Sequence, residues 1–369
     1  MIPQHKNLSP AMKFSCGSSA IILKHKWSVT TMRKMTGLER TLEFLKGTKT
    51  DRPPFHPIIM RWAAKYAGFK YRDFCTSYPA KCESMIRCAD DFDMDWVTVL
   101  SDPYAEASAF GIKCEYPEDD LPKDVSGHLP DMEAVKNLRP FRVMDHARPV
   151  NRINEIKEFK KRVGDKYFIV GWVEGPVAEY ADLRGVTNAS LDFMDDPVIV
   201  GQAMEVITEN AMEFITLQVE AGAHCVGIGD AFCSQIGPDL YKELAFEREK
   251  RMVDLIHKLG AKAKLHICGN THSIMPDMIK TGADIIDVDH LVPSMAEFAG
   301  LLGKGQVFSG KSDPVSVIQD GNASLIEQSV RECHEQARGR CIVSAGCEIT
   351  PGTTLENMRA YSKAAAKLS

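Results

Sequence analysis

The sequence predicts an α/β protein, a single (β/α)8 TIM barrel with an N-terminal extension. Two observations lead to this fold class. Short, nearly continuous apolar segments, typical of buried parallel strands, alternate with helical segments from about residue 55 onward. Eight strand segments are expected, each followed by helix, and eight is the number that closes this barrel. A doubly wound open sheet is the alternative, but no GxGxxG run opens a helix after the first expected strand.

The elements are expected in a regular order along the chain. Strands are expected at 55–60, 95–100, 167–173, 224–229, 261–268, 284–289, 306–310 and 341–346. Helices are expected at 40–45, 197–221, 239–259, 272–281, 294–302, 322–338 and 354–367. A Pro-rich, acidic segment at about 102–150 is expected to be irregular, with a small hairpin at 109–116.

The first 34 residues differ from the rest of the chain. They contain scattered Lys, His, Ser and Pro around one short apolar patch, Ala20–Leu23. The patch is too short for the apolar core of a signal peptide. We predict that 1–34 is an extension, disordered or packed outside the core, and that the barrel occupies 35–369.

The bulk composition excludes several functional classes. The 369 residues are 44% hydrophobic and 26% charged, with a net charge of −5 and no basic stripe, so nucleic acid is not expected as a partner. No apolar run approaches the length of a membrane span. The 11 cysteines are odd in number and form no regular framework, which favours a reducing cytoplasm over a secreted protein.

Polar side chains follow the expected strands, and in this barrel the active site lies where strands end. Arg61 follows the first strand, Glu174 the third and Asp230 the fourth. Asn270 follows the fifth strand and Asp289 ends the sixth. A single carboxylate at such a position is often only a helix N-cap, so none of them defines a site alone.

His266 and Cys268 are the strongest candidates for chemistry. Side chains alternate along a strand, so these two residues project to one face, and imidazole with thiolate is half of a zinc site. Cys347, after the last strand, can converge on them over the barrel axis and leave a fourth position open. The alternatives are that the three residues are unrelated, or that other donors take part, namely His272, His290 and Cys233.

Several motifs together resemble a known family. They are Gly37-Leu38-Glu39-Arg40, Asp51-Arg52-Pro53-Pro54, Met60-Arg61-Trp62-Ala63-Ala64-Lys65-Tyr66, Trp172-Val173-Glu174-Gly175-Pro176, His266-Ile267-Cys268-Gly269-Asn270 and Ser344-Ala345-Gly346-Cys347-Glu348-Ile349. From about Thr36 to its end the chain resembles the uroporphyrinogen decarboxylase superfamily. Within it, the chain looks like the corrinoid-dependent methyltransferases, which include the methylcobamide:coenzyme M methyltransferases.

Two positions favour the methyltransferase branch. Decarboxylases of the superfamily carry a second arginine where this chain has Lys65 and a histidine where it has Cys347, and they use no metal. The methyltransferases carry a His-x-Cys pair and a late Cys as zinc ligands. The resemblance therefore implies Zn²⁺ bound by His266, Cys268 and Cys347.

The resemblance also implies an activity and a partner. The enzyme would move a methyl group between a corrinoid (cobalamin) and a small molecule: a thiol such as coenzyme M, a methoxylated compound or tetrahydrofolate. The sequence contains no Asp-x-His-x-x-Gly run, the usual cobalamin-ligating signature, so the corrinoid is expected on a corrinoid-binding partner protein.

Roles for the other candidates follow from the same picture. Glu174 or Asp230 is expected to fill the fourth metal position in the absence of substrate, and Asn270 and Asp289 to bind a substrate ring or hydroxyl. Arg61 is expected to pair with a carboxylate or sulfonate. Two other functions stay open: a uroporphyrinogen decarboxylase acting on a tetrapyrrole, and a non-enzymatic barrel with a structural zinc.

Overall fold

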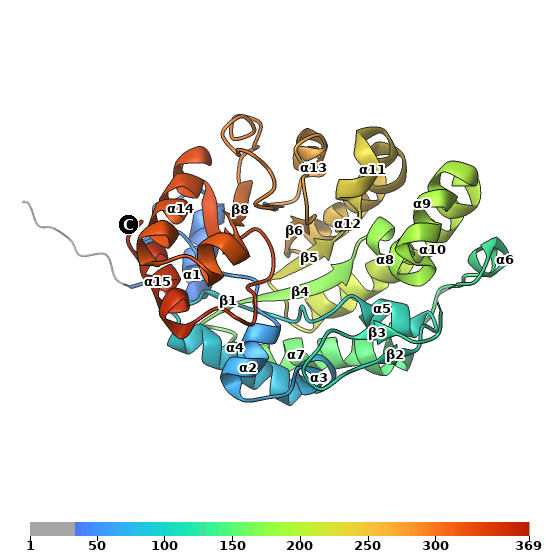
Figure 1. Ribbon diagram of the computed structural model, residues 1–369, viewed down its shortest axis with the longest axis horizontal. Helices are drawn as coiled ribbons and strands as arrows, with labels where there is room; N and C mark the ends of the chain where they lie inside the picture. The colour runs from blue at the N-terminus through green and yellow to red at the C-terminus, as the bar shows by residue number, and fades with distance from the viewer. Residues whose placement is uncertain (1–33, 128, 369) are drawn as a thin grey trace, which may run out of the picture. The chain divides into compact units, whose positions relative to one another are not determined.

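The computed structural model describes residues 34–127 and 129–368, and its centre is a curled, parallel seven-stranded sheet (Figure 1). The predicted extension, 1–34, lies outside these residues except for its last one. The sheet order is β1-β4-β5-β6-β7-β8-β9. The strands are β1 (Trp96–Thr98), β4 (Phe168–Glu174), β5 (Cys225–Gly229), β6 (Lys262–His266), β7 (Ile285–Val288), β8 (Val307–Ser312) and β9 (Cys341–Ala345). They coincide with the second to eighth expected strands, and the TIM-barrel-like α/β fold is confirmed.

The first expected strand, 55–60, is the exception. Phe55 makes one isolated parallel bridge to Val343 of β9. On its other side, the Phe55 carbonyl accepts from the Asp95 N–H just before β1, at 2.9 Å. Pro54 and Pro57 have no N–H to donate, so a continuous ladder cannot form here. The prediction of a strand was wrong, but this extended segment still lies between the last strand and the first and closes the ring.

Helices surround the sheet (Figure 1). They are α1 (Gly37–Leu45), α2 (Arg61–Ala67), α3 (Tyr71–Thr76), α4 (Tyr78–Asp91), α5 (Tyr104–Ala109), α6 (Met132–Lys136), α7 (Ala147–Val163), α8 (Pro176–Arg184), α9 (Val186–Asp195), α10 (Pro197–Glu220), α11 (Cys233–Leu240), α12 (Glu247–Lys258), α13 (Met275–Lys280), α14 (Ala323–Gln336) and α15 (Leu355–Ala366). Short turns of 3₁₀ helix, η1 (Val143–Asp145), and π helix, η2 (Tyr241–Phe246) and η3 (Pro314–Gln319), complete them.

Three local expectations were wrong. The segment 294–302 forms turns, since it is short and contains Gly300, a poor helix former. The helix expected at 239–259 is interrupted by η2, which separates α11 from α12. The small hairpin lies later than expected, with β2 (Cys114–Glu115) paired antiparallel to β3 (Lys123–Asp124), because 104–109 forms α5. No helix in the described ranges is long and apolar enough to cross a membrane.

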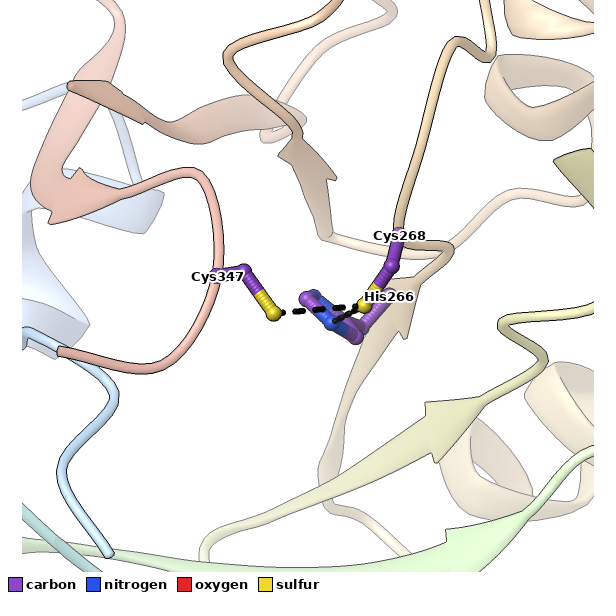
Figure 2. Close-up of side chains that lie close together, drawn as sticks. All are labelled: His266, Cys268 and Cys347. Atoms are coloured by element: carbon purple, nitrogen blue, oxygen red, sulfur yellow. Dashed lines mark hydrogen bonds between the residues drawn. The ribbon is translucent and has the colours of Figure 1, made fainter. Parts of the chain in front are cut away.

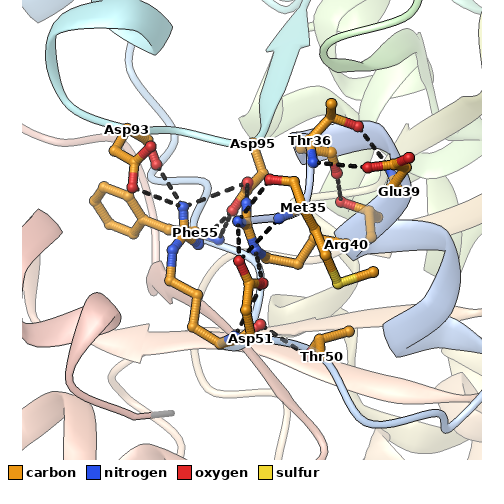
Figure 3. Close-up of polar contacts among 12 residues, drawn as sticks. Met35, Thr36, Glu39, Arg40, Thr50, Asp51, Phe55, Asp93 and Asp95 are labelled. Carbon is orange, nitrogen blue, oxygen red and sulfur yellow. Dashed lines mark hydrogen bonds and ion pairs between the residues drawn. The ribbon is translucent and has the colours of Figure 1, made fainter. Parts of the chain in front are cut away.

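The N-terminal end of the barrel is fastened by buried ion pairs (Figure 3). Asp95, only 1% exposed, pairs with the guanidinium of Arg40 and with that of Arg52, whose Nη1 lies 2.6 Å from Oδ2. The same Oδ2 accepts from the Phe55 N–H at 2.6 Å. Gly37 is required here, since a Cβ would lie 2.5 Å from the Asp95 carbonyl oxygen. These contacts account structurally for two sequence motifs, 37–40 and 51–54.

The C-terminal edge of the sheet carries the additional elements. Between β1 and α7 the chain forms α5, the β2–β3 hairpin and α6, and between β4 and α10 it forms α8 and α9. Each insertion follows the carboxyl end of a strand, which is where the active site of this fold lies.

Candidate metal centre

Three metal-competent side chains meet at the carboxyl ends of two strands (Figure 2). His266 is the last residue of β6, Cys268 follows it by two, and Cys347 follows β9 by two. The His266 Nε2 lies 2.9 Å from the Cys268 Sγ, which lies 3.4 Å from the Cys347 Sγ. All three ligand atoms are within 4.8 Å of one another.

The donor set fits zinc. A tetrahedral zinc ion with Zn–N and Zn–S bonds of about 2.0–2.3 Å separates its ligand atoms by about 3.3–3.8 Å. The observed separations need only small side-chain adjustments to reach these values. One imidazole and two thiol groups are soft ligands that suit zinc, and three protein ligands leave a fourth position for a substrate.

Of the three side chains, Cys347 is the one whose pKa is shifted toward the metal-binding form. Burial disfavours the imidazolium, yet hydrogen bonds to Asp287 and Cys347 raise the pKa of His266 to about 9. The hydrogen bond from Cys268, against the effect of burial and aided by His266, lowers the pKa of Cys347 to about 4. Cys347 is therefore a thiolate at neutral pH, the form in which cysteine binds metals. The hydrogen bond to Cys347, together with burial, raises the pKa of Cys268 well above its usual range, so Cys268 and His266 must each release a proton when a metal binds.

Asp287 in β7 orients the histidine. Its Oδ2 lies 2.9 Å from the His266 Nδ1 and 2.6 Å from the Nζ of Lys264, which is itself buried. Although burial favours the neutral acid, these two partners hold the pKa of Asp287 well below its usual range. A carboxylate on Nδ1 leaves Nε2 for the metal, as is usual for metal-binding histidines.

Glycines bring the ligand loops together. Gly269, directly after Cys268, has φ +95°, and its N–H donates to the Asp289 Oδ2 at 2.9 Å. Gly346, directly before Cys347, passes so close to the chain at 289–290 that a Cβ would lie 2.4 Å from the His290 nitrogen. The loops after β6, β7 and β9 are therefore packed against one another around the ligands.

The predicted substrate-binding residues lie in three different settings. Asp289 holds the ligand loop through Gly269 and also accepts from the Leu291 N–H at 2.9 Å. The Asn270 Oδ1 accepts from the His272 N–H at 3.1 Å, in a turn at the surface. The Arg61 Nη2 lies 3.3 Å from the Oε2 of Glu348, the neighbour of Cys347. Their roles toward a substrate stay predictions.

Arg61 also lines a cavity of about 460 Å³. The cavity lies between α2 and α3 and is lined by Arg61, Ala64, Lys65, Gly68, Phe69, Lys70, Tyr71, Asp119 and Pro351. Its basic side chains already have partners: the Lys65 Nζ donates to the Pro351 carbonyl, and the Lys70 Nζ to Asp119. The Arg61–Glu348 pair connects this cavity to the loop that carries Cys347.

Neither carboxylate predicted for the fourth metal position belongs to the three-ligand group in the described residues. Asp230 is fully buried, and its Oδ1 accepts from the Ala178 N–H, at the start of α8, at 2.6 Å. It forms a second buried group with Cys233 and Glu249. Burial raises the pKa of Asp230 to about 6, against the backbone donors that favour its charged form.

Glu174 lies at the mouth, on the barrel side of β4. Its Oε1 accepts from the Trp172 Nε1 at 3.0 Å, and the Trp172 and His266 rings are 5.8 Å apart. In the described residues the three alternative ligands do not join the three-ligand group either. Cys233 lies with Asp230, His272 lies 3.4 Å from Glu297 at the surface, and the His290 Nδ1 lies 2.8 Å from the Asp289 Oδ1.

Sequence reasoning missed the residues around the ligands. Lys264 precedes His266 by two on the same strand face, and a lysine inside an apolar strand signals a buried partner. Asp287 lies inside the neighbouring strand β7, where a carboxylate among apolar residues gives the same signal. Trp172 carried no signal, because an aromatic residue in a buried strand is ordinary core.

The comparisons with known proteins agree with this architecture. The family model "Uroporphyrinogen decarboxylase (URO-D)" matches residues 36–368. The chain belongs to the uroporphyrinogen decarboxylase family. The uroporphyrinogen decarboxylase of Synechococcus sp. (strain CC9605) is 26% identical over 342 residues, covering 88% of this chain and 94% of that protein.

Another relative of this chain is a methyltransferase by name. Methylcobamide:CoM methyltransferase MtaA of Methanosarcina barkeri is 27% identical over 211 residues, covering 56% of this chain and 60% of that protein. Among solved structures, a methyltransferase from Methanosarcina mazei has a TM-score of 0.81 at 22% identity, covering 90% of this chain and 99% of that one. A B12-independent methionine synthase from Shewanella sp. W3-18-1 follows, with a TM-score of 0.53 at 15% identity, covering 78% of this chain and 87% of that one. These likenesses support the fold.

Proposed function

We propose that the protein is a zinc-dependent methyltransferase that moves a methyl group between a corrinoid-binding partner protein and a small molecule. The observation that carries this proposal is the convergence of His266, Cys268 and Cys347 at the barrel mouth. Sulfur-rich coordination with one position open is a catalytic zinc site, since a structural site uses four protein ligands. This open position favours an enzyme over a barrel with a purely structural zinc.

The named methyltransferase relative supports the same class. MtaA of Methanosarcina barkeri acts, by its name, on methylcobamide and CoM, which indicates a corrinoid on one side of the reaction and a small thiol on the other. A methoxylated compound or tetrahydrofolate is the alternative small molecule. A zinc ion held by the three ligands would polarise the oxygen or sulfur atom of a substrate bound in its open coordination position.

The protein's own residues bind the metal ion and orient its ligands. His266, Cys268 and Cys347 hold the ion, Asp287 fixes the ring of His266, and Asp289 fixes the loop behind Cys268. We place the enzyme in the cytoplasm, where the free thiols of the described cysteines stay reduced.

The second candidate is uroporphyrinogen decarboxylase, acting on a tetrapyrrole. It is favoured by the decarboxylase relatives, which match 88% of this chain at 24–26% identity. Cys347 and Lys65 stand against it, since decarboxylases carry His and Arg there. A decarboxylation assay with uroporphyrinogen decides between the two.

Metal content and methyl transfer test the proposal together. The purified protein is expected to hold about one zinc per chain and to exchange methyl groups between methylcobalamin and a small molecule. Cys347→Ser is expected to lose both properties, whereas Cys114→Ser, which changes a half-buried thiol away from the site, keeps both. A metal-free preparation that transfers methyl groups at the full rate would rule the zinc mechanism out.

A further inference from the structure

Glu174 and His266 lie in one row across three neighbouring strands. Glu174 of β4 is in register with Gly229 of β5, and Gly229 is in register with His266 of β6. Residues in one row of a parallel sheet face the same side, and two strand spacings put their Cα atoms about 9–10 Å apart. The residue between them has no side chain. The Glu174 carboxyl group and the metal-binding nitrogen thus border the same part of the barrel mouth.

An indole occupies the space beneath this row. A Cβ on Gly229 would lie 2.5 Å from the Cζ2 of Trp172, and one on Gly227 would lie 2.5 Å from its Cε3. The two glycines are therefore what lets the ring lie across β5, beside His266. From there its Nε1 donates to the Glu174 Oε1 at 3.0 Å. This bond fixes the Oε1 oxygen, so the proton of a neutral Glu174 carboxyl group would lie on Oε2.

Glu174 belongs to a group of carboxyl side chains whose charges act on one another. Glu106 of α5 accepts from the Glu174 N–H at 3.1 Å, and Glu179 and Asp182 of α8 complete the group. Both carboxyl oxygens of Glu179 are buried without a hydrogen-bond partner. We call Glu106, Glu174, Glu179 and Asp182 the acid cluster.

Among the described residues, the guanidinium of Arg152 is the cation that acts on Glu106, Glu174 and Glu179. Arg152 belongs to α7 and lies 3.1 Å from Glu106. The charges that act on Asp182 are all acidic, namely Glu106, Asp102 and Asp230. Buried carboxyl groups that outnumber their cations must hold protons. Burial, with Glu106 and Asp182 as like charges, accordingly raises the pKa of Glu174 well above its usual range.

We propose that Glu174 is the proton donor to an oxygen leaving group, so that the enzyme removes methyl groups from methyl ethers or methanol. This inference rests on the proposed function. In the step, the bond between the methyl carbon and the substrate oxygen breaks, and the carbon bonds to the cobalt of a cob(I)amide, the reduced corrinoid, on the partner protein. Cobalt supplies the electron pair, and the oxygen keeps its bonding pair and takes the Glu174 proton. The carboxylate left behind is reprotonated from water.

The same arrangement suits a thiol poorly. A thiol that accepts a methyl group must first lose its proton, and a carboxyl group that is already protonated cannot take it. An alkoxide or phenoxide, in contrast, is a basic leaving group that gains from a positioned acid. The acid cluster thus favours demethylation of an oxygen compound over methylation of a thiol.

The test compares the wild-type protein with Glu174→Gln and with a control, Glu335→Gln, which changes an exposed glutamate on α14. Zinc content and the infrared band of protonated carboxyl groups are measured first. Methyl transfer to cob(I)alamin is then followed from anisole, whose phenoxide is a poor leaving group, and from 4-nitroanisole, whose nitrophenoxide is a good one. Methyl transfer from methylcobalamin to 2-mercaptoethanol is the thiol reaction.

We expect Glu174→Gln to keep its zinc, to lose intensity in the infrared band and to slow anisole demethylation by roughly 10²–10⁴-fold. The rate with 4-nitroanisole should fall much less, and Glu335→Gln should match the wild type throughout. Equal slowing of both ethers, an unchanged infrared band, or a wild-type protein that transfers methyl groups only to the thiol would overturn this inference alone. A wild-type protein without zinc and without any methyl transfer would overturn the proposed function as well.

Discussion

His266 and Asp287 are joined by a 2.9 Å hydrogen bond between Nδ1 and Oδ2, and this bond determines which ring nitrogen is left for a metal. Asp287 also forms an ion pair with Lys264. Its carboxylate in β7 therefore holds both Lys264 and His266, which lie on the same face of β6. The ligand is therefore oriented before any ion arrives.

Asp287→Asn is expected to weaken zinc binding about 10–100-fold, because an amide does not stabilise the ring in the same tautomer. Competition with a chromophoric chelator measures the change. The matched control is Asp284→Asn at the start of the same strand, which also pairs with a histidine and a lysine, His257 at 2.7 Å and Lys262 at 2.8 Å. Equal zinc affinity in the two variants would contradict the role given to Asp287.

Asp95→Asn is expected to destabilise the protein by about 3–5 kcal/mol, because it leaves two buried guanidinium groups, Arg40 and Arg52, without their shared carboxylate. Chemical denaturation gives the free energy of unfolding. Asp93→Asn removes a second partner of Arg52. The Asp93 side chain is 48% exposed, so its loss should cost at most about 1 kcal/mol. Similar losses for both variants would show that burial of the ion pairs is unimportant.

His56 is expected to make the protein sensitive to acid. It is buried and stacked on Trp96 at 4.6 Å, and burial together with Lys264 lowers its pKa to about 3. Between the unfolded value near 6.5 and about 3, the unfolded state binds the proton and the folded state does not, so stability falls as the pH falls. At pH 5 this loss is about 2 kcal/mol.

His56→Phe should remove this part of the pH dependence, so that its unfolding free energy changes less between pH 7 and pH 5 than that of the wild type. Denaturation curves at the two values measure the difference. His146→Phe, at a partly exposed histidine, serves as the control and should keep the wild-type slope. A wild-type slope in His56→Phe would refute the assignment.

Gly229→Ala is expected to lower stability by about 1–3 kcal/mol, because its Cβ would overlap the indole of Trp172 at 2.5 Å. Thermal unfolding followed by circular dichroism measures the loss. Gly201→Ala is the matched control: it lies inside α10, its Cβ would meet nothing closer than 3.7 Å, and alanine favours helix there by up to about 1 kcal/mol. If both alanines were tolerated, the close packing on β5 would be disproved.

Sequence pattern predicted the periodic parts of this fold well. Seven strands and the long helix α10 follow from continuous apolar runs between glycines and prolines. The segment 55–60 carries the apolar residues of a strand, but its prolines remove the donors that a ladder requires. The segment 294–302 has the pattern of a helix but forms turns. Short helices depend on tertiary packing, which a local sequence pattern does not reveal.

The grouping of His266 and Cys268 with Cys347 was predictable because a spacing of two residues at the end of a strand brings His266 and Cys268 to one side. That they bind a metal stays a prediction. Asp230 was harder to predict. Asp230 directly follows β5, a position similar to that of Glu174 at the end of β4. Its side chain nevertheless accepts a hydrogen bond from the Ala178 N–H on α8 and does not belong to the three-ligand group. The start of a helix attracts a carboxylate, and which neighbouring helix lies within reach is decided by packing. The acid cluster was hidden for the same reason, since its members come from three separate elements.

The bridge between Phe55 and Val343 has a consequence for assembly on the ribosome. The segment around Phe55 can bond to Asp95 early, but its second partner, β9, lies near the far end of the chain and is synthesised late. Until then, the edges of this segment and of the growing sheet stay open, and open edges invite pairing with other chains. The strands from β1 to β8 can pair as they are synthesised. The contact between Phe55 and β9, which closes the barrel, forms last. Truncation even shortly before Val343 should therefore leave an unclosed, aggregation-prone product instead of a smaller stable domain.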